Sequence, residues 1–279
     1  MNNIDTNLFG NVSSPDDFGE ILEITAMHSD RRRNVYMWRG QGNIDWPIHS
    51  SAYRRLMKKY SPKVSEDNMR RYEKGLLSSA AHQGYDHDNG RKLSDLEVLA
   101  KLQHHGAATR LVDFSRNILV ALWFACNSEP EKTGLLLGIH TRYLGGYEGE
   151  LGDGEYDLVL GDDSIRNLDY PQSWQPPVVT KRIAAQGAQF LYSAVSSDPM
   201  GSLAFDKRNE AFISLALSPK FKKYMLLLLE GTFDIRHLTL FPEIDGFCYT
   251  NSDRFKPSSN HRWKSEDRYN KIIVSPFCR

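Results

Sequence analysis

The sequence predicts an α+β protein, in which a helical first half packs on a mainly antiparallel or split mixed β-sheet built largely from the second half. Three observations predict this class. Helical spacing recurs between residues 16 and 105, with one early strand among the helices. The segment Ile118 to Cys126 is apolar on nearly every face, which is typical of a buried central helix. From Thr133 onward, short β-rich runs are separated by Gly, Asp and Pro.

Start and stop signals place the elements of the first half. Predicted helices cover residues 16–28, 50–60, 65–85 and 94–106, with a strand at 35–38 between the first two. Ser94-Asp-Leu-Glu97 is a capping box, in which the serine side chain and the glutamate three residues later satisfy free backbone N–H groups. Ser115 is placed to cap the buried helix.

The second half supplies most of the predicted strands. They cover residues 135–140, 156–160, 178–180, 189–195 and 211–217. Ser218 and Pro219 open a helix that extends to about Glu230, and a last helix begins at Pro242. We expect an N-terminal helical extension over residues 1–29, a domain over 30–250 and a polar tail over 251–279.

Composition excludes several classes of protein. Lys and Arg total 35 against 35 Asp and Glu, so no global charge attracts nucleic acid or a membrane surface. No apolar run approaches the ~20 residues of a membrane span, and the N-terminus lacks the pattern of a secretory signal, which places the protein in the cytoplasm. Cys126, Cys248 and Cys278 lack the spacing of a zinc site and are expected to be free thiols.

A first group of candidate residues lies at the end of the early strand. Arg39 offers a planar donor fork that suits a phosphate or carboxylate, and Gly40 and Gln41 follow it. A glycine at this point lets a ligand approach the backbone. The alternative is an arginine paired with a carboxylate at the edge of the core.

A second group lies between a helix end and the buried helix. It comprises Gln103, His104, Thr109, Arg110 and Asp113, a density of polar groups that packing alone rarely requires. The adjacent histidines His104 and His105 project in different directions on a helix, so we expect no metal site here. The alternative is that Thr109 and Asp113 cap helix ends and that Arg110 pairs with Asp113.

Two further motifs complete the candidates. Lys181 to Phe190 is predicted to be a basic turn before a strand, in which Arg182 and Gln186 contact a ligand phosphate or a nucleic-acid backbone. Glu243 and Asp245 lie near a helix start, where negative side chains are favourable in any case. Signatures of serine hydrolases, P-loop NTPases, zinc proteases and Rossmann dehydrogenases are absent from the sequence.

Taken in order, four segments resemble the FRG domain family. They are WRGQ at 38–41, LQHHGAATRLVDFSRNILVALWFAC at 102–126, KRIAAQGAQF at 181–190 and LFPEIDG at 240–246. The central motif is the specific one, and the resemblance extends over about residues 30–250. His105, Ala108, Val112 and Phe114 stand where the family more often has tyrosine, proline, leucine and tryptophan.

The resemblance implies an ADP-ribosyltransferase-like fold and an enzyme that uses NAD to modify a nucleic acid or a protein. Arg39, with Gly40 and Gln41, would hold a phosphate or ribose of NAD, and Gln103, Thr109, Arg110 and Asp113 would position the dinucleotide. Glu243, Asp245 and His104 would be catalytic, with a carboxylate stabilising the oxocarbenium-like transition state. Arg182 and Gln186 would bind the acceptor.

The family also implies a bacterial or phage-related setting, as a toxin or phage-defence effector with a neutralising antitoxin. The alternatives are a non-catalytic nucleotide- or nucleic-acid-binding module and a protein-interaction domain. An acidic ExD motif replaces the more usual ExE or QxE of these transferases, so the sequence leaves open which carboxylate is catalytic.

Overall fold

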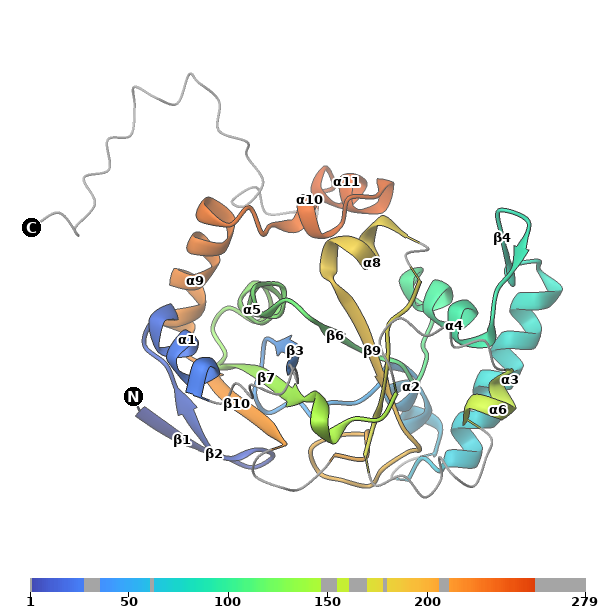
Figure 1. The fold of residues 1–279 in the computed structure, drawn as a ribbon, viewed down its shortest axis with the longest axis horizontal. Coiled ribbons are helices and arrows are strands. Elements are labelled where there is room, and N and C mark those ends of the chain that lie inside the picture. The colour runs from blue at the N-terminus through green and yellow to red at the C-terminus, as the bar shows by residue number, and fades with distance from the viewer. Residues whose placement is uncertain are drawn as a thin grey trace, which may run out of the picture.

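The computed structural model describes residues 2–27, 36–60, 63–146, 155–160, 170–177, 180–205 and 211–253. An eight-stranded sheet in the order β1-β2-β10-β7-β3-β6-β9-β8 forms its centre (Figure 1). The strands of this sheet are β1 (Asn2–Thr6), β2 (Gly10–Ser14), β3 (Tyr36–Gln41), β6 (Val112–Ser115), β7 (Gly134–His140), β8 (Gln172–Trp174), β9 (Ala188–Tyr192) and β10 (Phe212–Leu217). A separate ribbon pairs β4 (His87–Asp88) with β5 (Arg91–Lys92).

The helices surround this sheet (Figure 1). They are α1 (Phe18–Met27), α2 (Ser51–Tyr60), α3 (Glu66–His82), α4 (Asp95–His104), α5 (Ile118–Asn127), α6 (Tyr156–Leu160), α8 (Lys181–Gln186), α9 (Pro219–Thr232), α10 (His237–Leu240) and α11 (Ile244–Thr250), with a 3-10 turn at Thr141–Tyr143. The predicted α+β class and the mainly antiparallel pairing are confirmed, and β2 with β10 is the parallel pair among the described strands. The expectation that the second half supplies most of the sheet was wrong, because β1, β2, β3 and β6 all lie within residues 2–115.

The sheet is nearly divided at its middle. β7 and β3 pair along six residues, whereas β3 and β6 share a single pair, Trp38 with Ser115. Beyond that pair the two strands diverge. We call this point the fork, because the sheet divides there into a part that ends in β3 and a part that begins with β6.

Local signals account for many elements. Ser94 and Glu97 form the predicted capping box of α4, and Ser218 caps α9. Other predictions were wrong. The buried helix α5 is capped by Asn117, whereas the Ser115 hydroxyl accepts from the Asn117 N–H and donates to the Gln186 carbonyl.

Two segments have a different secondary structure from the one predicted. Residues 156–160 were predicted to be a strand but form α6, because the Asp95 carboxylate accepts from the Tyr156 N–H at the start of that helix. The predicted turn at 181–187 is helix α8, which Gly187 ends with a φ of 52°, a conformation that favours glycine. The strand predicted at 178–180 lies outside the described residues except for Thr180, and the predicted tail lies outside them from residue 254 onward.

The N-terminal residues are part of the same fold. β1 and β2 form a hairpin that joins the sheet through a pair between Ser13 and Leu215. In α1, Ile21 and Ile24 are buried in the main core. The boundary predicted after residue 29 is therefore not a structural one, because the residues before it share the sheet and the main core with the rest of the chain.

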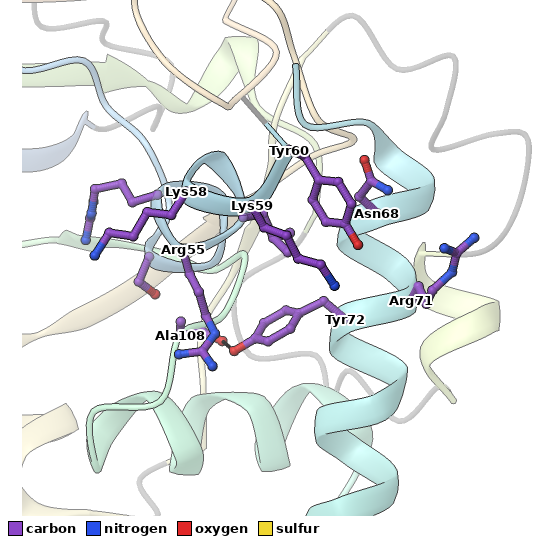
Figure 2. Close-up of a pocket in the computed structure, with 11 residues that line it drawn as sticks. Arg55, Lys58, Lys59, Tyr60, Asn68, Arg71, Tyr72 and Ala108 are labelled. Carbon is purple, nitrogen blue, oxygen red and sulfur yellow. Dashed lines mark hydrogen bonds between the residues drawn. The ribbon is translucent and has the colours of Figure 1, made fainter. Parts of the chain in front are cut away.

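Helices α2 and α3 lie beside each other and enclose a pocket at the surface (Figure 2). The first residues of α2 are attached to the segment after α4, because the Thr109 N–H donates to the Ser51 hydroxyl and the Ala52 N–H donates to the Thr109 carbonyl. The position of α2 thus depends on the course of residues 105–111.

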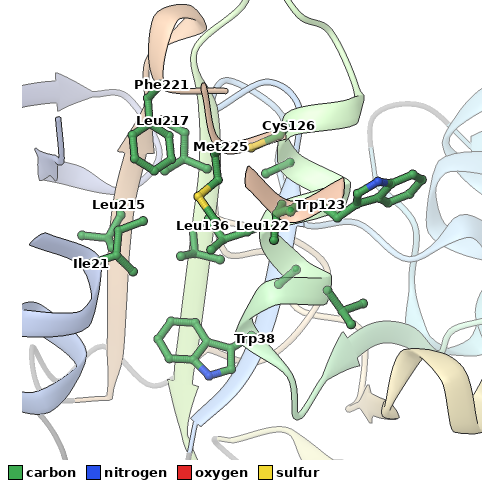
Figure 3. Close-up of a cluster of buried hydrophobic side chains, with 14 of the residues drawn as sticks. Ile21, Trp38, Leu122, Trp123, Cys126, Leu136, Leu215, Leu217, Phe221 and Met225 are labelled. Atoms are coloured by element: carbon green, nitrogen blue, oxygen red, sulfur yellow. The ribbon is translucent and has the colours of Figure 1, made fainter. Parts of the chain in front are cut away.

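The main core lies between α5 and one face of the sheet (Figure 3). Leu136, Leu215 and Leu217 point from the strands toward Leu122 and Met225 of α5 and α9 (Figure 3). Alternate residues of β7, including Leu135 and Leu137, face a second core on the opposite side. α5 is therefore surrounded by apolar side chains, as its sequence predicted.

Gly40 allows β3 and α5 to approach closely. A Cβ at Gly40 would lie 1.8 Å from the Ala121 carbonyl oxygen, which is far inside van der Waals contact.

Among the described segments, no helix combines the length and apolarity that a membrane crossing requires.

We expect Gly40→Ala to lower the free energy of unfolding by about 3 kcal/mol or to prevent folding, since α5 must move to admit the methyl group. Gly75→Ala is the control, because Gly75 lies within α3 and a Cβ added there would meet open space. That change should raise the stability by up to about 1 kcal/mol. Denaturant unfolding measures both, and equal stabilities for the two variants would contradict the close approach at Gly40.

Candidate functional site

Arg39 lies at the fork of the sheet. β3 carries its guanidinium into the gap where β3 and β6 separate, and its Nη1 donates to the Asp113 carbonyl at 2.7 Å. Its Nε is buried, with no hydrogen-bond partner among the described residues. Burial lowers the pKa of Arg39, and Asp113 nearby opposes that shift. A buried guanidinium N–H without a partner is a donor available to a ligand.

Two adjoining cavities share Arg39, Gly40 and Phe124 in their walls. The fork cavity, of about 200 Å³, lies between β3, β6 and α8 and includes Asp113, Ser115, Arg182 and Gln186 among its lining residues. The loop cavity, of about 500 Å³, lies against the segment after β3 and includes Trp46, His49 and Arg54. We call the two together the Arg39 groove. Three arginines and one carboxylate, that of Asp113, line it.

The walls of the loop cavity are held by a buried lysine that the sequence analysis missed. Lys222 of α9 is 1% exposed, and the three N–H groups of its Nζ are shared among four backbone carbonyl oxygens at 2.6–3.0 Å. These carbonyls belong to Gly42, Ser128, Glu129 and Lys132. The ammonium group therefore fixes the loop after β3 against the end of α5.

A short network orients Asp113. Gln103 Nε2 donates to the Asp113 carboxylate at 2.8 Å, and the Thr109 hydroxyl donates to the Gln103 side-chain carbonyl. Thr109 is fully buried, so it does not line the groove and acts through Gln103. Asp113 itself is exposed at the fork cavity.

His104 and Glu243 meet although 139 positions separate them. His104 Nε2 lies 2.6 Å from Glu243 Oε2, and the His104 side chain is 8% exposed. Burial lowers the pKa of His104, the Glu243 carboxylate opposes this, and Arg182 and His105 add to the lowering. At neutral pH the imidazole is therefore neutral and donates to a carboxylate. Neither residue lines the Arg39 groove.

Arg182 connects the fork cavity to the acidic segment. Its guanidinium lies 4.5 Å from the centre of the Phe241 ring, and burial lowers its pKa against the opposing charges of Asp113, Glu243 and Asp245. Gln186 lines the same cavity and donates to the Leu240 carbonyl at 3.1 Å. Asp245 is exposed on α11 and is not among the residues that line the groove. Its charge acts on Arg182, which does line it.

Arg110 is not part of this group. Its side chain is 3% exposed and its Nε donates to Glu73 at 2.6 Å, with further bonds to Glu66, Tyr156 and the Ser193 carbonyl. Both the expected contact with NAD and the alternative pairing with Asp113 are therefore wrong for Arg110, since it points away from the groove into a buried ion-pair network.

Gly40 and Gln41 line the groove but do other work as well. Gly40 is required by the packing of α5, and Gln41 Nε2 donates to the Trp46 carbonyl at 2.6 Å, which closes the loop after β3.

Sequence reasoning missed His49 and Arg54 as groove residues. His49 stacks on Tyr53 at 4.4 Å, and its Nδ1 is buried without a partner in the described part of the chain.

Direct contacts thus link the Arg39, 103–113 and 243–245 segments in one region, with Arg182 between them. No set of three His, Cys, Asp or Glu side chains suited to a metal ion occurs within the described residues.

Residues 34–134 match the FRG domain. The matched span includes Arg39, the 103–113 segment and the buried helix α5, and it excludes α8 and the acidic segment near α11. No curated protein and no solved structure matches the chain.

We expect Arg110→Met to lower the free energy of unfolding by about 3–5 kcal/mol, because Glu73 would remain charged and buried without its partner. Lys74→Ala is the control, since it removes an ion pair with Asp157 that is exposed to solvent, and should change stability little. A similar loss of unfolding free energy in both variants would mean that the Arg110 network does not stabilise the folded state.

His104 should titrate below the ordinary pKa of histidine, and Glu243→Gln should lower that pKa further by removing the charge that raises it. Since the folded state then binds fewer protons than the unfolded chain, stability falls as the pH drops below 6.5, and falls more in the variant. Side-chain NMR titration and thermal unfolding between pH 5 and pH 8 measure this. A His104 pKa above 6.5 would contradict it.

Proposed function

We propose that this chain, whose residues 34–134 match the FRG domain, is an ADP-ribosyltransferase-like enzyme that uses NAD to modify a macromolecular acceptor. One observation carries the proposal. Arg39 presents a buried Nε–H, with no partner in the described part of the chain, where two adjoining cavities meet at the fork of the sheet. A dinucleotide with a central pyrophosphate needs such an elongated groove with a cation near its middle.

The charges of the groove support an anionic ligand. Arg39 and Arg54 line the loop cavity, and Arg39 and Arg182 line the fork cavity. Guanidinium groups bind phosphate oxygens through paired N–H donors, so Arg39 would bind the pyrophosphate from the position that both cavities share. Phe124 and Trp46 offer apolar surface to a base or a ribose.

The proposal assigns the transition-state role to Asp113, because its carboxylate lines the fork cavity and Gln103 orients it. The bond between the ribose and nicotinamide breaks, and nicotinamide leaves with the electron pair. The carboxylate stabilises the resulting oxocarbenium-like charge. The acceptor then forms a bond to the same ribose carbon and gives up a proton.

His104, Glu243 and Asp245 have a different place in this proposal. Their side chains do not line the cavities. They would instead influence the charge and the position of Arg182, which does line the fork cavity. The expected catalytic carboxylate of the acidic segment is thus replaced by Asp113, with Glu243 as a positioning residue.

The sheet supports the same proposal at the level of the fold. A mixed sheet that separates at β3 and β6, with the groove at the separation, is the arrangement that an ADP-ribosyltransferase-like fold would provide for NAD. A role as a toxin or phage-defence effector, with a nucleic-acid or protein acceptor and a neutralising partner, belongs to this proposal as well.

The test is to incubate the purified protein with NAD labelled in its adenylate part and with a cell extract, and to measure nicotinamide release and label transfer. We expect Arg39→Ala and Asp113→Asn to lower both by about 100-fold or more, since each removes a charge that acts at the reacting dinucleotide. Glu243→Gln should lower them less, because its carboxylate faces His104.

Arg142→Ala is the matched control, since Arg142 is an exposed arginine on the 3-10 turn outside the groove, and it should leave both readouts unchanged. Binding of NAD by a folded protein that releases no nicotinamide would replace the enzyme with a nucleotide-binding module. A protein that neither binds nor cleaves NAD would overturn the proposal.

A further inference from the structure

A second pocket, formed by α2 and α3, carries a concentration of positive charge, and of its cations the proposed chemistry uses Arg54 alone. It has a volume of about 710 Å³. Five cations line it, and they are Arg54, Arg55, Lys58 and Lys59 from α2 and Arg71 from α3. We call it the basic pocket. All five are exposed, no carboxylate is among the lining residues, and no ion pair to any of them occurs within the described residues.

The buried network explains why the charge of this pocket is not neutralised. Glu66 and Glu73 are on the same helix as Arg71, but their carboxylates point inward to Arg110. Glu66 also accepts from the Val195 N–H at 2.7 Å. Two of the three acidic side chains of this helix are thereby committed elsewhere, and the third, Asp67, is not among the residues that line the pocket. The lining of the pocket is therefore basic although the whole chain has no net charge.

Two tyrosines stand among the cations (Figure 2). Lys59 Nζ lies 5.1 Å from the centre of the Tyr60 ring, and the Arg55 guanidinium lies 5.7 Å from that of Tyr72. The Tyr72 hydroxyl donates to the Ala108 carbonyl at 2.9 Å, which fixes the ring beside the cavity. Figure 2 shows the Lys59 ammonium directed between the two rings.

Cations beside aromatic rings suit a chain of nucleotides, because the phosphates contact the cations while unpaired bases stack on the rings. A duplex does not fit this pattern, since its bases are stacked on one another. We propose that the basic pocket binds single-stranded nucleic acid.

The basic pocket also adjoins the Arg39 groove. Arg54 lines both, and its Nη1 donates to the carbonyl of His49, a residue of the loop cavity. A strand held in the basic pocket would therefore extend toward the proposed NAD site. We extend this proposal by one step that rests on the proposed function: the bound strand is the acceptor of the ADP-ribosyl group.

The binding test uses fluorescence anisotropy with labelled single-stranded oligouridylate, oligothymidylate and a duplex, over a series of salt concentrations and without NAD. Both single strands should bind more tightly than the duplex, with a steep loss of affinity as salt rises. The double variant Lys58→Glu, Lys59→Glu should weaken binding about tenfold or more. Tyr72→Ala should also weaken it about tenfold, whereas Tyr72→Phe keeps the ring and the affinity.

The matched control is Lys220→Glu, Lys223→Glu, which reverses two exposed lysines on α9 that lie outside the pocket, with the same change in net charge. Equal losses in the two double variants, tighter binding of the duplex, or displacement of the oligonucleotide by polyglutamate at equal charge would overturn the proposal. Circular dichroism verifies that each variant is folded.

Nicotinamide release measured alongside separates the two proposals. The Lys58→Glu, Lys59→Glu variant should release nicotinamide from NAD as the wild type does and should lose nuclease-sensitive labelling. Cleavage of NAD with no oligonucleotide binding would overturn the basic pocket alone. Oligonucleotide binding by a chain that cleaves no NAD would overturn the proposed enzyme and the acceptor role, and would support the pocket as a binding site.

Discussion

The buried pair of Arg110 and Glu73 is the interaction on which the arrangement of both surfaces depends. Glu73 is completely buried, and it accepts from the backbone N–H and the Nε of Arg110 and from the hydroxyl of Tyr156. A charge in this position is tolerated only when every polar atom is satisfied. The network accordingly ties α3 to α6 and to the segment that leads into β6.

The consequences of this network reach the groove through short contacts. With Arg110 turned inward, the neighbouring Thr109 is fixed between Ser51 and Gln103. Gln103 then orients the Asp113 carboxylate at the fork. On the other side, the same network draws the carboxylates of Glu66 and Glu73 away from the surface, which leaves the cations of α2 and α3 exposed. The same buried network therefore adjoins both the groove and the basic pocket.

The fork is the second constraint. A continuous sheet would pair the backbone of β3 with that of β6 and leave no room beside Arg39. Instead one residue pair joins the strands, and the Arg39 guanidinium bridges the gap to the Asp113 carbonyl. Gly40 makes this possible from the other side, because α5 can then lie against β3 without a side chain between them. Gly40 thus allows α5 to pack on β3, and the adjacent Arg39 lines the groove.

The sequence by itself determined the features that arise from neighbouring residues. The Ser94–Glu97 capping box, the Ser218 cap and the buried character of α5 are local patterns, and the FRG resemblance was confirmed over residues 34–134. The tertiary structure decided the rest. Tyr156 begins a helix because a carboxylate from residue 95 meets it, and Arg110 pairs with residue 73 in place of Asp113. The contact of His104 with Glu243 and the fork beside Arg39 likewise join residues that are far apart in the chain, and no periodicity or cap specifies such partners because each is chosen by the packing of whole elements.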